Sequence, residues 1–92
     1  MNREAAEVLA INALGWLAGQ EDLLGVFLGA SGSSVDALRE KAGDPEFLGA
    51  VLDFICMDDA WVVAFCDIQE IAYDQPMRAR AMLPGGEQVH WT

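Results

Sequence analysis

Helix-start signals recur at short intervals along this 92-residue chain, so each predicted helix must be short. The clearest is Gly43-Asp44-Pro45-Glu46. Asp44 can cap a helix, Pro45 suits the first helical position because the N–H that it lacks would have no partner there, and Glu46 is favoured near the positive end of the helix dipole. This tetrapeptide predicts a helix from Pro45 to about Met57.

Apolar residues at helical spacing predict five further helices. They cover residues 3–18, 20–28, 34–42, 59–72 and a last segment that starts near Asp74 and ends before Pro84. The alternation in AWVVAFC could indicate a strand, but Phe65, Ile68 and Ile71 continue the helical spacing and no partner strand is evident. We therefore predict an all-α fold: a single compact orthogonal bundle of about five to six short helices over residues 1–86, followed by a flexible tail over residues 87–92.

The first of these helices is apolar almost all round, which is typical of a helix at the centre of a domain. We therefore expect Asn12 to be buried and hydrogen-bonded, and Gly19 to end the helix in the left-handed conformation. A capping-box pattern that begins at Ser33 precedes the third helix, which should bury Val35 and Leu38.

The chain is richer in apolar residues than an ordinary domain. Hydrophobic residues make up 53% of the sequence and nine glycines add to them, whereas ordinary domains reach roughly 45–50% with glycine included. A domain of this length buries only part of its surface. Some apolar area must then face outwards, which favours a homodimer or a surface for a partner protein.

A net charge of −10 and only five basic residues argue against binding to nucleic acid or to an anionic membrane surface. The apolar runs are far shorter than the roughly 20 residues that cross a bilayer, and the start MNREAAE does not resemble a secretory signal. We expect a cytoplasmic, bacterial-type protein.

The two cysteines, Cys56 and Cys66, lie in apolar helical segments without a basic neighbour. Reduced, buried thiols are therefore the favoured interpretation, and a disulfide, a redox role or a metal role is the alternative. Because the chain has one histidine, His90, and no C-x-x-C motif, it offers no ligand set for zinc. We expect no metal and no cofactor.

Between Lys41 and Arg78 the chain carries eight carboxylates and no basic residue, set among its most apolar runs. This pattern predicts a hydrophobic groove or ridge on residues 45–72 with a negative rim, suited to a protein partner with a basic, amphipathic surface. The carboxylates are Asp44, Glu46, Asp53, Asp58, Asp59, Asp67, Glu70 and Asp74. The candidate interaction surface comprises Asp58, Asp59, Trp61, Asp67, Glu70, Asp74 and Trp91.

Some of these acidic residues also have a structural interpretation, which competes with a role in an interaction surface. Asp53 lies in the most hydrophobic helix and is expected to be paired, with Arg39 or with free N–H groups at the next helix start, rather than to act as a general base. Asp58-Asp59 fits a helix cap better than a calcium loop, because the residues from Trp61 onwards are apolar.

The segments AEVLAINALGWLAG, DLLGVFLGASG, ALREKAGDPEFLGAVLDFICMDDAWVVAFC and AMLPGG together resemble a small bacterial protein family of unknown function, best represented in alphaproteobacteria. The chain keeps the acid pair Asp58-Asp59, the Phe65-Cys66 pair and the terminal LPGG of that family. The resemblance implies an all-α fold and a cytoplasmic location, and it transfers no catalytic residue. Family members are often encoded near response-regulator genes of cell-cycle signalling, which favours a regulatory role.

Taken together, these patterns predict a non-enzymatic protein–protein interaction or regulatory module. Two other classes remain open. One is an acidic decoy that occupies the nucleic-acid-binding site of another protein, which requires carboxylates spread over one face at phosphate-like spacing. The other is a small-ligand-binding or enzymatic helical domain, which requires a pocket among the aromatic side chains.

Overall fold

The computed structural model describes residues 1–32 and 34–83, and these residues form six α-helices and no strand. The predicted all-α class is confirmed. The helices are α1 (Arg3–Ala18), α2 (Glu21–Ser31), α3 (Val35–Lys41), α4 (Pro45–Cys56), α5 (Asp59–Gln69) and α6 (Gln75–Met82). Within the described residues, no helix is long and apolar enough to cross a membrane. The predicted tail over residues 87–92, with Trp91, lies outside the described residues.

Side-chain caps explain where four of these helices begin. Asn2 accepts a hydrogen bond from the Ala5 N–H at 2.7 Å, and Asp58 accepts one from the Ala60 N–H at 2.8 Å. Asp44 caps α4 as predicted, through the Glu46 N–H at 3.0 Å. Ser34 caps α3 through the Ala37 N–H at 3.2 Å. The capping role assigned to Ser33 was therefore misplaced by one residue, and Ser33 itself lies outside the described residues.

Two helices end at a residue in the left-handed conformation. Gly32, with φ 69°, closes α2, and Glu70, with φ 58°, closes α5. The prediction that α5 continues to Ala72 was wrong, because Glu70 is left-handed and the Ile71 N–H bonds back to the Cys66 carbonyl at 3.1 Å. Gly19 was also misjudged: its φ of −83° is right-handed.

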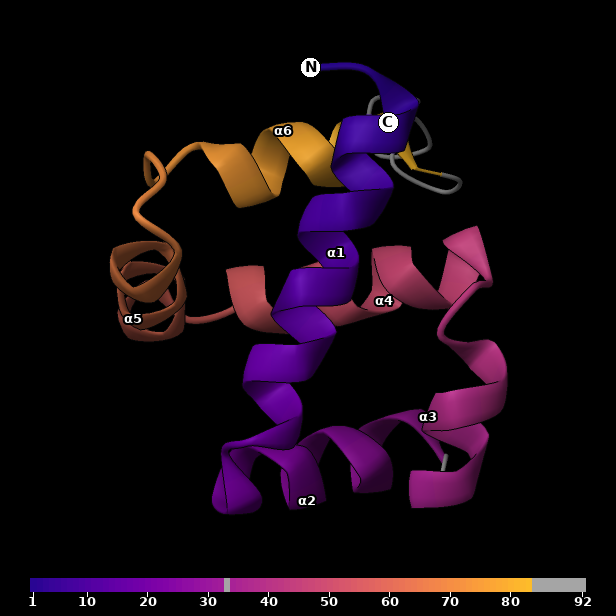
Figure 1. Cartoon of the computed structure of the whole chain (residues 1–92). Helices are drawn as coiled ribbons and strands as arrows, with labels where there is room; N and C mark the ends of the chain where they lie inside the picture. Colours follow the sequence, from indigo (N-terminus) through magenta and orange to yellow (C-terminus); the bar gives the residue numbers. More distant parts are fainter. Residues whose placement is uncertain (33, 84–92) are drawn as a thin grey trace, which may run out of the picture.

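Alanines on α1 let the helices approach closely at the centre of the fold. Figure 1 shows α1 crossing in front of α4, with α6 near one end of α1 and α2 at the other. Ala6, Ala10 and Ala13 are fully buried at helical spacing, and so are Val51 and Ile55 of α4. Burial of this apolar area is the main stabilising term, at roughly 25 cal/mol per Å².

The opposite side of α1 faces solvent, so the expectation that Asn12 is buried was wrong. Val8 is 54% exposed and Ile11 is 47% exposed, and Asn12 is exposed as well. Val35 of α3 is 52% exposed, whereas Leu38 is buried as predicted. An all-round apolar sequence therefore leaves an apolar strip on the surface in this fold.

Candidate interaction surfaces

Helix α5 separates the predicted surface residues into two groups. Asp58, Asp59 and Trp61 lie at its start, and Asp67 and Glu70 lie at its end. Of this set, Trp91 lies outside the described residues. The described acidic residues of this set therefore lie at both ends of α5 and beyond its C-terminal end.

The acid pair at the start of α5 has a structural role. The Asp58 side chain holds the Ala60 N–H, as an N-cap does, and Asp59 is exposed in the first helical turn. A negative charge there is stabilised by the helix dipole. In the ranges 1–32 and 34–83, no group of three or more His, Cys, Asp or Glu side chains is placed to hold a metal ion.

At the end of α5, the Tyr73 hydroxyl donates a hydrogen bond to the Asp67 carboxylate at 2.7 Å. This hydrogen bond, followed by the negative charge of Asp67, raises the pKa of Tyr73 above its ordinary value. Asp67, Glu70 and Tyr73 border a shallow hollow of about 380 Å³. Asp74 lies beyond it and forms a long ion pair with Arg78 at 3.9 Å, both groups being more than half exposed.

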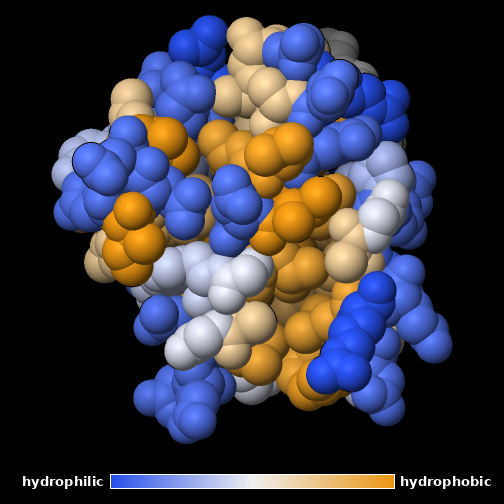
Figure 2. All heavy atoms as spheres, viewed as in Figure 1, coloured by the Kyte–Doolittle hydropathy of each residue, from blue (hydrophilic) through white to orange (hydrophobic). Residues whose placement is uncertain are grey.

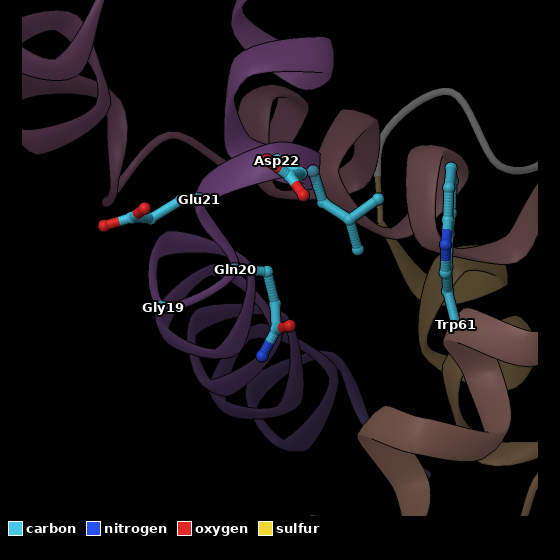
Figure 3. A pocket seen from close by; sticks show the side chains of 6 residues that line it. Gly19, Gln20, Glu21, Asp22 and Trp61 are labelled. Carbon is cyan, nitrogen blue, oxygen red and sulfur yellow. The ribbon is translucent and has the colours of Figure 1, made fainter.

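Trp61 faces a second and larger hollow that no sequence pattern predicted. This hollow has a volume of about 540 Å³ and lies between Trp61 of α5 and residues 19–23, where α1 passes into α2. Phe54 stacks on the indole at a centroid distance of 4.9 Å and an interplanar angle of 25°. In Figure 3 the indole is seen edge-on across the hollow from Gln20 and Asp22, whereas Glu21 points away from it. We call this site the Trp61 hollow.

The carboxylates beside the Trp61 hollow have no cation to neutralise them in the part of the chain that the structure describes. Three of the five basic side chains are held elsewhere, because Arg3 pairs with Glu7, Arg78 with Asp74 and Arg80 with Asp53. Lys41 lies over the Phe47 ring at 6.0 Å from its centroid. Arg39 lines a different groove, so none of the five forms an ion pair with Asp22 among the described residues.

Asp53 has the expected structural role with a different partner. Its carboxylate accepts a hydrogen bond from Nε of Arg80, so the ion pair joins α4 to α6. The proposed pairing with Arg39 was wrong. Sequence spacing could not reveal the partner, because the two residues lie 27 positions apart.

Both cysteines are free, and each is shielded. Cys66 is fully buried and Cys56 is half-buried. Burial raises the pKa of both thiols, and Asp53 raises that of Cys56 further, while Arg80 opposes the effect. A raised pKa keeps the thiol protonated and slows its reactions as a nucleophile.

An apolar depression lies outside the predicted region 45–72. It is a groove of about 440 Å³ between α1, α2 and α3. Figure 2 shows the hydrophobic band that runs along α1 and into this groove, with hydrophilic groups on both sides. The groove is lined by Ile11, Leu14, Gly15, Ala18, Leu24, Val35, Leu38, Arg39 and Ala42. The sequence signal that could have found it is the strip Val8, Ile11, Gly15 and Ala18 on one side of α1.

Comparison with known proteins gives one match. A family model described as "Protein of unknown function (DUF3572)" matches residues 3–86. Comparisons with curated proteins and with solved structures found no significant match.

Proposed function

The chain belongs to the DUF3572 family of proteins of unknown function, and we propose that it is a non-enzymatic protein-interaction module that receives a basic side chain of its partner in the Trp61 hollow. The observation that carries this proposal is the juxtaposition of an indole with the Asp22 carboxylate, which has no ion-pair partner among the described residues.

The walls of the Trp61 hollow match the two parts of a lysine or arginine side chain. Leu23 and the indole of Trp61 offer apolar surface to the methylene stem. Asp22 and the amide oxygen of Gln20 offer acceptors to the charged head, and an aromatic ring attracts a nearby cation. Asp22 lies in the first turn of α2, close to the positive end of the helix dipole.

The surrounding charge favours a basic partner. Glu21 follows Gln20 at the start of α2, and Asp58 and Asp59 precede Trp61 by three and two residues. With a net charge of −10, the protein attracts a cationic segment from a distance, and salt weakens this attraction. The partner of this proposal is therefore a basic, amphipathic protein segment. Two free thiols suit a cytoplasmic compartment, where cysteines stay reduced.

A matched pair of charge reversals tests the proposal. The probe is a fluorescently labelled amphipathic helical peptide of leucine and lysine, and its binding is measured by anisotropy at several salt concentrations. Asp22→Lys should weaken binding by about tenfold, the effect of losing one good charged contact. Asp36→Lys makes the same change in net charge at the corresponding turn of α3, away from the hollow, and should have a much smaller effect.

Equal weakening by Asp22→Lys and Asp36→Lys would show that the peptide follows net charge alone and would overturn the proposed site. The same two variants then serve as baits in affinity capture from native host extract. A partner that is lost with Asp22→Lys and kept with Asp36→Lys is the expected result.

A further inference from the structure

The apolar groove between α1, α2 and α3 shares no lining residue with the Trp61 hollow. We infer that it is a homodimer interface, in which α1 of a second copy lies antiparallel to α1 and places its exposed apolar strip in the groove. This inference concerns a different set of residues and is independent of the proposed function.

The first argument is that α1 carries both halves of a self-complementary surface. Its N-terminal half presents a ridge, where Val8 is 54% exposed and Ile11 is 47% exposed. Its C-terminal half borders the groove, where Gly15 and Ala18 form the wall. A Cβ atom built on Gly15 would meet no atom within 4 Å, so another helix can approach the backbone there.

The second argument is the position of Ile11, close to the midpoint of the 16-residue helix. If a twofold axis passes beside Ile11, Val8 of each copy lies opposite Leu14 of the other, next to Gly15, and Glu4 lies opposite Ala18. Each ridge then fills the other groove, as the isologous interface of a twofold dimer requires. Val35, which is 52% exposed on the far side of the groove, is covered in the same step.

The third argument is charge complementarity. Arg39 is the one charged residue among those that line the groove, and no ion pair to it is formed in the described ranges. Glu4 lies near the ridge end of α1 and is exposed, while its neighbour Arg3 is paired with Glu7. The antiparallel arrangement brings Glu4 of each copy opposite Ala18 of the other, which lines the same groove as Arg39. Each groove then receives one negative charge beside its own positive charge, although the whole protein is acidic.

A concentration series in analytical ultracentrifugation, with the full chain at moderate salt, tests the inference. The wild type should show a reversible monomer–dimer equilibrium. Ile11→Glu should abolish the dimer, while the matched variant Ile68→Glu, at a residue that is 63% exposed on α5, should leave it unchanged. Circular dichroism shows whether each variant is folded.

A charge swap tests the antiparallel register without touching the apolar core. Glu4→Arg alone and Arg39→Glu alone should each weaken dimerisation by about five- to tenfold, and the two together should restore it. A wild type that stays monomeric, a dimer that tolerates Ile11→Glu, or a double variant that is no better than the single ones would each overturn the inference. If the protein stays monomeric and binds an amphipathic peptide through Ile11, the groove is a site for another protein. Binding of the lysine peptide at Asp22 is measured in a separate experiment.

Discussion

Nε of Arg80 on α6 donates to Oδ1 of Asp53 on α4, with the arginine side chain 19% exposed and the aspartate side chain 57% exposed. This pair joins the last described helix to the helix at the centre of the fold. The same segment is also attached through its apolar side, where Pro76, Ala79 and Leu83 are buried. The short α6 thereby gains a polar as well as an apolar attachment.

A double-mutant cycle with Asp53→Asn and Arg80→Gln should give a coupling energy of about 0.5–1 kcal/mol, because the aspartate remains partly solvated. Chemical denaturation of the four proteins measures it. The exposed pair Asp74 and Arg78, separated by 3.9 Å, is the matched control and should give a coupling near zero. Equal couplings for the two pairs would contradict the role assigned to Asp53.

Asp44→Ala should lower the free energy of unfolding by about 0.5–2 kcal/mol, because the Glu46 N–H loses its cap at the start of α4. Urea denaturation followed by circular dichroism measures the loss. Asp36→Ala is the control, since Asp36 lies in a first helical turn while Ser34 holds the cap of α3. An unchanged midpoint for Asp44→Ala would show that the cap contributes nothing.

Tyr73 is the one tyrosine in the chain, so its phenolate absorbance can be titrated directly. The hydrogen bond to Asp67 stabilises the neutral phenol, and the titration midpoint should therefore lie above the ordinary 10.0. Asp67→Ala should move the pKa of Tyr73 back towards 10.0, while Glu70→Gln, beside the same hollow, should move it less. If Asp67→Ala leaves the midpoint unchanged, the hydrogen bond between Tyr73 and Asp67 is absent in solution.

Native thiol labelling should be slow at Cys66 and faster at the half-buried Cys56, and denaturant should speed up both. The variants Cys56→Ser and Cys66→Ser report the two rates separately. Burial raises the pKa of each folded thiol above 9.0, so unfolded thiols ionise first as the pH rises. The contribution to stability is therefore complete below about pH 9 and is lost as the pH rises through the folded-state values.

Glu70→Gly should stabilise the protein by about 0.5–1 kcal/mol, because Glu70 holds a φ of 58° that glycine adopts without steric cost. Thermal denaturation measures the gain. Gln69→Gly, one residue earlier and inside α5, should destabilise the protein instead. A loss of stability with Glu70→Gly would show that its side chain contributes more than the backbone strain removes.

The local signals in the sequence determined the helices. Asp44 and Asp58 each stand just before a helix and accept a hydrogen bond from the N–H two residues later. The interaction that starts α4 or α5 therefore depends on a few neighbouring residues. The same holds for α1, whose bounds follow from its apolar run. The end of α5 was missed because a left-handed glutamate carries no local signal comparable to glycine.

Tertiary structure alone decided which surfaces meet solvent. Apolar residues occupy nearly every side of α1, so their spacing does not distinguish the buried Ala10 from the exposed Ile11. The distinction arises because α4 and α6 cover only one side of α1. The packing of separate helices also pairs Asp53 with Arg80 and brings Trp61 and Asp22 to one hollow. Helical spacing relates residues within one turn of each other, whereas these contacts depend on how separate helices pack, which no short segment encodes.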